Sequence, residues 1–167
     1  VIPRHLFSGI TGTPVSYMFS QTFYMDTSIT TLPEGLFGGL DGAPASNLFD
    51  STFYGCSSLQ YIPNNLFGNL HGRPALYMFY KTFQDCTSLT GEIPLGLFGD
   101  YENYYRSYMF GYTFANCSGL TGPSARMPDG TFLYNYFTTG SGYSQMSKTY
   151  QGCTKLSDYA SIPTASK

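Results

Sequence analysis

The chain has 167 residues, of which 42 % are hydrophobic and only 11 % are charged, and its formal net charge is −2. This length suits one domain and allows a sizeable buried core. The eight basic residues are scattered, which excludes a basic nucleic-acid surface. No apolar run approaches the ~20 residues that span a bilayer.

An apolar residue followed by proline recurs along the chain at steps of 30, 30, 31, 34 and 35 residues. The copies then share a pattern of Phe, Met-Phe, Thr-Phe, Cys and Leu at matching offsets, with single replacements such as Leu48 for Met and Asp26 for Cys. Such a repeat predicts stacked units, because one unit cannot bury its own apolar face. We expect residues 1–167 to form a single repeat domain, part of a longer array. The copies begin near Ile2, Leu32, Ile62, Ile93 and Met127, with a partial copy at Ile162.

The third copy illustrates the expected elements in chain order. Leu59–Ile62 is short and stands before a proline, which favours a brief strand. Leu66–Leu70 predicts a turn of α- or 3₁₀-helix, and a loop then leads to Pro74. The apolar residues at 75, 78, 79, 83 and 86 follow the 3.6-residue period of a helix over 74–86. Each copy is therefore expected to be strand, helical turn, loop and helix.

These elements predict an α/β repeat, a solenoid of about five copies of ~30–35 residues. Paired strands lie ~4.8 Å apart, whereas helix axes need ~8–10 Å. We therefore expect the stack to curve, with its sheet on the inner face.

Cysteine occupies one repeat position in copies two to five, and Asp26 stands there in the first copy. We favour buried free thiols that act as small apolar core residues, because stacked helix ends should exceed the ~4.4–6.8 Å between the Cα atoms of a disulfide. Disulfide pairing and a metal or catalytic role are the alternatives. The expected core ladder is Cys56, Cys86, Cys117 and Cys153 with Phe23, Phe53, Phe83 and Phe114.

The frame C-x-x-L-x-x-I-P-x-x-L-F-x-x-L, closed by A/T-F-x-x-C, resembles the leucine-rich repeats of bacterial surface antigens, the BspA-like class, over residues 2–163. The Met78-Phe79 and Met109-Phe110 pairs also resemble the repeat of certain bacterial surface lipoproteins. This unit is longer than the commonest surface-antigen repeat and has only one clear strand leucine. The resemblance implies a right-handed leucine-rich-repeat solenoid, display at a bacterial surface, and binding of host proteins, matrix or other cells. It supplies no catalytic residues.

Groups suited to chemistry are sparse. His5 and His71 fall at non-equivalent repeat positions, with no cysteine or carboxylate at metal-ligand spacing, so we expect solvated surface residues. No phosphate-binding glycine pattern occurs. We therefore expect no enzyme, no cofactor and no metal site.

The fourth copy replaces a short loop with residues 99–108, which carry four tyrosines and an arginine. Tyrosine gives a large contact area at low entropy cost, so this segment and the aromatic residues 132–137 are the candidate partner-binding patch. Its members are Tyr101, Tyr104, Tyr105, Arg106, Tyr108, Tyr134 and Tyr136. Alternatively, these rings wrap adjacent helices or cover the end of the stack. The second candidate surface comprises the polar positions Thr30, Thr31, Gln60, Tyr61, Thr90 and Glu92.

Two functions are expected from these features. The first is an extracellular interaction or adhesion module that binds a protein or glycan at a cell surface, without catalysis, nucleic-acid binding or membrane insertion. The alternative is a structural subunit of a surface fibre or filament that joins copies of itself end to end, because neither end offers a charged capping segment. Val1–Pro3 shows no signal-peptide pattern, so an exported protein would have its signal removed or outside this sequence.

Overall fold

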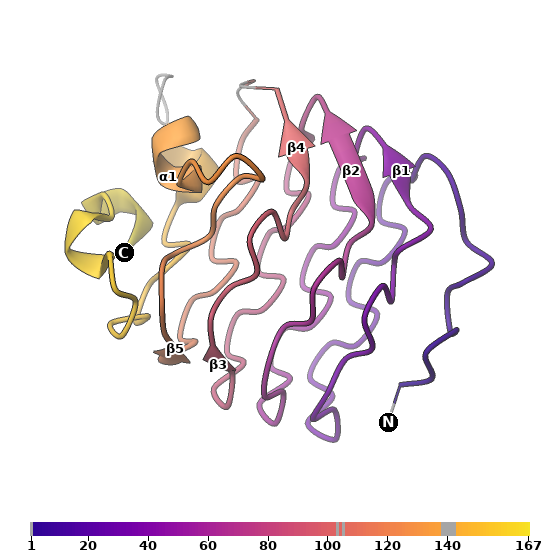
Figure 1. Cartoon of the computed structure of the whole chain (residues 1–167), viewed down its shortest axis with the longest axis horizontal. Coiled ribbons are helices and arrows are strands. Elements are labelled where there is room, and N and C mark those ends of the chain that lie inside the picture. Colours follow the sequence, from indigo (N-terminus) through magenta and orange to yellow (C-terminus); the bar gives the residue numbers. More distant parts are fainter. Residues whose placement is uncertain (1, 103, 105, 138–142) are drawn as a thin grey trace.

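The computed structural model describes residues 2–102, 104, 106–137 and 143–167, and successive copies lie side by side from the N-terminal to the C-terminal end (Figure 1). The helices within this described part lie in the C-terminal third of the chain. They are α1 (Leu133–Tyr136) and the 3₁₀ helices η1 (Tyr143–Met146), η2 (Tyr159–Ser161) and η3 (Thr164–Ser166). The strands are β1 (Asp41–Gly42), β2 (Asn69–Gly72), β3 (Thr90–Gly91), β4 (Asp100–Tyr101) and β5 (Gly119–Leu120).

The predicted right-handed leucine-rich-repeat solenoid of strands and helices is wrong. The strands pair in small parallel sheets, most of the described chain forms turns, and only 8 % of the structure is helical. Residues 74–86 form a run of turns instead of a helix. The predicted curvature depended on helices, whose axes need a wider spacing than paired strands. Because the copies lack these helices, that reason for curvature is gone.

Two parallel sheets join the copies along opposite sides of the stack, β1-β2-β4 at the top of Figure 1 and β3-β5 at the bottom. Asp41 pairs with Asn69, and His71 pairs with Asp100, so each strand meets its equivalent in the next copy. The first sheet lies where the sequence predicted a loop. The predicted strand Leu59–Ile62 is not a strand in the described structure, although Gln60 N donates to Thr30 O at 3.0 Å.

The turn segments, residues 15–26, 45–56, 75–86, 107–117 and 146–153, alternate two kinds of backbone hydrogen bond. Met18 N donates within its own copy to Val15 O at 3.3 Å, whereas Phe19 N donates to Leu48 O of the next copy at 3.0 Å. The same alternation repeats from copy to copy, and the backbone hydrogen bonds between copies in these segments run from an N–H to a carbonyl of the following copy. An α-helix would consume these N–H groups internally, so the stack replaces the helix.

Every fourth residue of a turn segment has a positive φ, as at Lys81 (56°) and Asp85 (61°). Each is the third residue of a turn, where type II geometry requires φ > 0. Side chains therefore face inward in pairs, with Met78 and Phe79 buried and the next two residues facing outward. This four-residue period is close to the 3.6 of a helix, which explains the wrong helix prediction.

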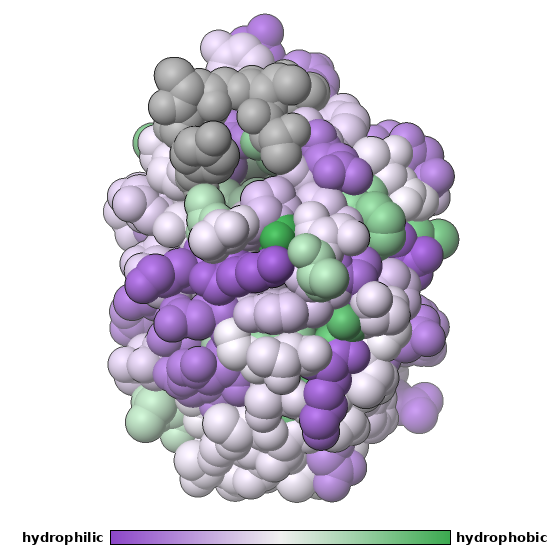
Figure 2. Space-filling model, turned by 90° about the vertical axis from the view of Figure 1, so that its left-hand side faces the viewer, coloured by the Kyte–Doolittle hydropathy of each residue, from purple (hydrophilic) through white to green (hydrophobic). Residues whose placement is uncertain are grey.

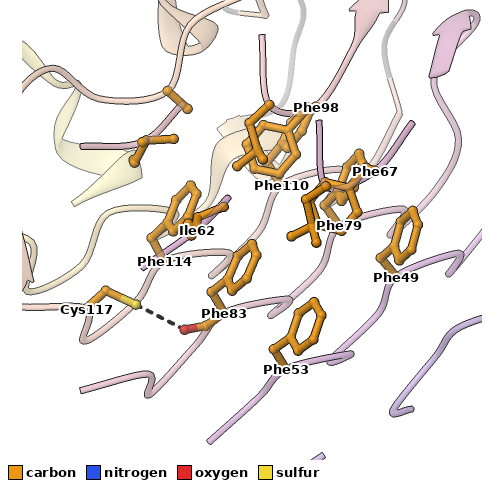
Figure 3. Packing of buried hydrophobic residues seen from close by; sticks show 14 of the residues in the cluster. Phe49, Phe53, Ile62, Phe67, Phe79, Phe83, Phe98, Phe110, Phe114 and Cys117 are labelled. Carbon is orange, nitrogen blue, oxygen red and sulfur yellow. Dashed lines mark hydrogen bonds between the residues drawn. The ribbon is translucent and has the colours of Figure 1, made fainter. Parts of the chain in front are cut away.

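The core is built of phenylalanine columns that run along the stack (Figure 3). Phe53 and Phe83 stack with ring centroids 5.4 Å apart, and the Phe83 and Phe114 rings stack 5.6 Å apart with almost parallel planes. Threonine hydroxyls link the copies beside them, since Thr82 Oγ1 donates to Phe49 O at 2.8 Å. The repeat sequence thus encodes columns of like side chains.

The two ends of the stack differ. At the C-terminal end, Lys148 N and Tyr150 N donate to Ala165 O and Ser166 O at 2.8 Å each. The surface on that side is mostly hydrophilic to neutral (Figure 2). The first copy instead exposes apolar side chains, with Val15 62 % exposed.

Candidate binding face

The predicted tyrosine patch is split between surface and core. Tyr101 is only 1 % exposed and Tyr134 only 4 %, so their assignment to partner contact is wrong. Tyr101 belongs to β4, whose pairing with β2 turns its ring inward, and its hydroxyl has no hydrogen-bond partner among the described residues. The half-buried Tyr136 donates its hydroxyl to Tyr101 O at 2.7 Å. Tyr136 of the fifth copy thus packs against the fourth copy, but the adjacent helices that the competing interpretation expected these rings to wrap are absent from the turn segments.

Tyr104 and Arg106 lie at the surface beside the third copy, whereas Tyr105 lies outside the described residues. The Tyr104 ring is 4.8 Å from the Arg73 guanidinium and 4.4 Å from that of Arg106. Arg73 Nε also stands 3.4 Å from Glu102 Oε2. The guanidinium groups thus already have partners within the molecule, which makes this cluster less available to a ligand.

A second group of rings and cations lies on the outward side of the turn segments. We name it the tyrosine–lysine face. The Tyr77 and Tyr108 rings stack at 5.4 Å with an interplanar angle of 6°. Tyr80 meets both rings edge-on, at 5.3 and 5.9 Å. Its members, drawn from copies three to five, are Tyr77, Tyr80, Lys81, Tyr108, Tyr112 and Lys148.

Two ammonium groups flank the central ring of this face. Lys81 Nζ and Lys148 Nζ each stand 5.8 Å from the Tyr112 ring centroid, and Lys81 Nζ is 5.0 Å from Tyr80. Lys81, Tyr112 and Lys148 occupy the same repeat position in copies three, four and five, so their side chains follow one another along the stack. Such cation–π contacts hold the charges at the ring faces.

The backbone at this face is unfavourable for the residues it carries. All its members except Tyr80 have positive φ, from 51° at Lys148 to 58° at Tyr112. This conformation costs about 1–2 kcal/mol for a residue other than glycine, asparagine or aspartate. Gly55 and Gly152 occupy the same kind of turn position elsewhere, so glycine fits it. The same conformation recurs outside the face at Tyr17, Gln21, Met25 and Ser51, so it belongs to the turn segments as a whole.

Of this face, only Tyr108 was among the residues predicted from the sequence to contact a partner. The residue before the Met-Phe pair is tyrosine in three copies, Tyr17, Tyr77 and Tyr108. Reading inward and outward pairs at a period of four would have placed Tyr77 and Tyr80 on one surface.

The alternative surface of polar positions lies on another side of each copy. Thr30, Gln60 and Thr90 are exposed, and Thr90 Oγ1 donates to Gln60 O at 3.2 Å. These positions form a solvated row that links neighbouring copies, with Tyr61 48 % exposed beside it. They gather no cluster of charge or rings comparable to the tyrosine–lysine face.

The four cysteines form a buried, unpaired column next to the phenylalanines. Each thiol donates to a carbonyl of the preceding copy, as Cys117 Sγ does to Phe83 O at 3.0 Å (Figure 3). They sit in turns rather than at the predicted helix ends. Phe23 in the first copy is only half-buried, whereas Phe53, Phe83 and Phe114 are fully buried.

Burial decides the acid–base behaviour of these thiols. It raises the pKa of Cys56 to about 11 and that of Cys153 to about 12. The pKa values of Cys86 and Cys117 are raised well above their ordinary value for the same reason. A neutral buried thiol is a poor nucleophile and metal ligand, so the column suits packing and hydrogen bonding.

The histidines stand apart from each other. His71 Nε2 is 3.6 Å from Asp41 Oδ1, and both side chains are more than half exposed. His5 lines a cavity of about 840 Å³ with Arg4 and Glu34. No group of three His, Cys, Asp or Glu suited to a metal ion occurs among the described residues.

No helix within the described ranges has the length and apolar character needed to cross a membrane. Comparisons with protein-family models, with curated proteins and with solved structures found no match for this chain.

Proposed function

We propose that the chain is a non-catalytic adhesion or interaction module, displayed outside the cell, which binds through the tyrosine–lysine face. Display outside the cell rests on the resemblance of the repeat to bacterial surface antigens. The observation that carries the binding role is the cluster itself, in which tyrosine rings from adjacent copies pack together and two ammonium groups stand at the Tyr112 ring.

The face also has the composition of a contact surface. Tyrosine is enriched in protein interfaces and paratopes because it offers area and a hydroxyl at low entropy cost. The stack beneath it is held by hydrogen bonds between copies, such as Lys81 N to Gly111 O at 2.9 Å. A rigid support lowers the entropy lost on binding.

Adhesion of beads coated with the chain to fixed epithelial cells and to immobilised matrix proteins tests this role. The Tyr80→Ala/Tyr112→Ala double variant should lose at least about tenfold in bound beads. Tyr61→Ala is the matched control, because Tyr61 is an exposed tyrosine outside the face. Tyr104→Ala tests the loop cluster separately. Equal adhesion by the double variant and by Tyr61→Ala would refute the assignment, as would adhesion to none of the surfaces.

An end-to-end fibre subunit is the second candidate, and the first copy supports it. No described residue donates a hydrogen bond to the carbonyls of residues 16, 18, 20, 22 and 24, and Met25 is 54 % exposed nearby. Asp26 acts against stacking, because the equivalent thiols donate to a carbonyl of the preceding copy, whereas a carboxylate only accepts.

Light scattering after size exclusion, over a range of concentrations, tests the fibre. If ends join, Asp26→Cys should raise the apparent mass above that of the wild type at equal concentration. If both the wild type and Asp26→Cys had the mass of a monomer at every concentration, the fibre would be excluded.

A further inference from the structure

The cations of the tyrosine–lysine face lack carboxylate partners. Among the described residues, ion pairs form only between His71 and Asp41 and between Arg73 and Glu102. Lys81 and Lys148 therefore direct their ammonium groups at the Tyr112 ring without a neutralising acid. Lys148 is exposed. A cation held at a ring face and left unneutralised is available to an anion from outside.

The rings supply the other half of a recognition surface. Tyr77 and Tyr108 present stacked rings from adjacent copies, and Tyr112 lies between the two lysines. The C–H bonds of a pyranose ring are weakly positive and pack on the negative face of an aromatic ring, while acidic substituents pair with ammonium groups. Alternating rings and cations therefore complement a sugar chain that carries acids.

From this arrangement we propose that the tyrosine–lysine face binds an acidic glycan, with pyranose rings on the tyrosines and acid groups at Lys81 and Lys148. The inference rests on the proposed function and specifies its ligand class. The shared chemistry is a sugar that bears a carboxylate or a sulfate.

A peptide fits this face less well. Peptides are commonly bound by a free strand edge or by a groove. The backbone groups beneath the face are paired between copies, as in Phe79 N to Met109 O at 2.9 Å. The cavities of about 840 and 490 Å³ are lined by other residues. A row of rings without a strand edge or pocket therefore favours flat sugar rings.

Isothermal titration calorimetry of the whole chain tests the proposal with four probes: heparin oligosaccharides, hyaluronan oligosaccharides, neutral maltohexaose and oligo-glutamate. We expect an acidic glycan to bind at least about tenfold more tightly than maltohexaose and oligo-glutamate. Added salt should weaken this binding, because the ammonium groups are solvent-accessible. Binding of heparin alone identifies the sulfate as the acid, and binding of hyaluronan shows that a carboxylate suffices; both support the proposal.

Variants separate this face from the remaining surface. Lys81→Gln/Lys148→Gln should weaken glycan binding by about tenfold, and Tyr112→Ala by at least about fivefold. Lys155→Gln removes an exposed lysine outside the face and should change affinity less than about twofold. Denaturation midpoints of each variant establish that the fold is kept.

Three results would overturn the proposal: no binding of either acidic glycan, equal affinity for oligo-glutamate or maltohexaose, or equal losses in Lys155→Gln and the double lysine variant. Bead adhesion that depends on Tyr80 and Tyr112 without glycan binding would refute the glycan and leave the proposed function standing. If the chain showed neither bead adhesion through this face nor glycan binding, the glycan proposal and the proposed function would both be refuted.

Discussion

The inward and outward sides of the turn segments share one backbone but differ in side-chain type, in burial and in backbone conformation. Inward, Phe53, Phe83 and Phe114 repeat one side chain, and each is fully buried. Outward, the position of Lys81 holds glutamine, serine, tyrosine or lysine in the other copies. Inward residues occupy a relaxed backbone, whereas the outward Lys81 and Tyr112 have positive φ.

This difference separates two requirements on one segment. Like side chains must align in columns, because each copy packs on its equivalent in the next copy. Outward side chains do not affect that alignment, so they are free to vary and to carry function. Substitutions on the inward side should therefore change stability, and those on the outward side should change binding.

The largest expected effect is alkaline unfolding, which reports the buried acids. Burial raises the pKa values of Cys56, Cys153 and Tyr101 above those of the unfolded chain. These groups therefore ionise more readily in the unfolded chain than in the folded one. The stability that their burial contributes is fully present below pH ~9 and is lost as the pH rises through about 11 to 12. Urea midpoints measured from pH 7 upward should stay level and then fall steeply.

The Cys56→Ala/Cys153→Ala double variant is the control for this transition. It should be less stable at neutral pH but should lose less stability between pH 9 and 12, because two of the buried acids are gone. A pH profile as steep as that of the wild type would contradict the assignment to the thiols.

Next in size is Phe83→Ala, which interrupts the central column. The ring stacks on both Phe53 and Phe114, and its loss should lower the free energy of unfolding by about 3–5 kcal/mol. Chemical denaturation measures this change. Tyr80→Ala, on the outward side of the same copy, should cost less; equal losses would erase the distinction between the two sides.

Thr82→Val tests one link between copies at nearly constant volume. Thr82 is buried, and its hydroxyl donates to Phe49 O of the preceding copy. The substitution should lower the free energy of unfolding by about 1 kcal/mol. Thr22→Val is the matched comparison, because Thr22 Oγ1 bonds only within its own copy, to Phe19 O, and is exposed. A smaller loss at Thr82 than at Thr22 would contradict a linking role.

The smallest effect, and the one of opposite sign, is expected for Lys148→Gly. Glycine relieves the positive φ of 51° and should raise the free energy of unfolding by about 0.5–1 kcal/mol, while adhesion falls. Lys155→Gly, at an exposed position without positive φ, should instead destabilise slightly. Stabilisation of the chain without a loss of adhesion would show that Lys148 is not part of the binding face.

The sequence predicted the repeat register and the aligned columns, because identical offsets require identical packing. It did not predict the backbone. A period of four and a period of 3.6 differ little over the short segment from Pro74 to Cys86. The residues present argue against a helix, since Phe, Tyr, Thr and Cys have modest helix propensities. The decisive factor was the neighbouring copy, which offers carbonyls to alternate N–H groups.

The candidate site was predicted poorly for a related reason. Exposure of a tyrosine depends on which way its copy folds, and Tyr101 and Tyr134 turn inward where the fourth and fifth copies depart from the template. Tyr77 and Tyr80 looked like ordinary repeat residues. Their importance depends on contacts with Tyr108 and Tyr112 of the next copy, which no single copy reveals.

The one-way hydrogen bonds of the turn segments give the stack an electrical polarity. Peptide dipoles of about 3.5 D largely cancel in ordinary sheets, but here those that join the copies add along the stack. Free carbonyls make the first copy partially negative, and the N–H groups of the fifth copy, at Lys148 and Tyr150, make that end partially positive. An approaching anion is therefore drawn to the end that carries Lys148, and each further copy lengthens the aligned array.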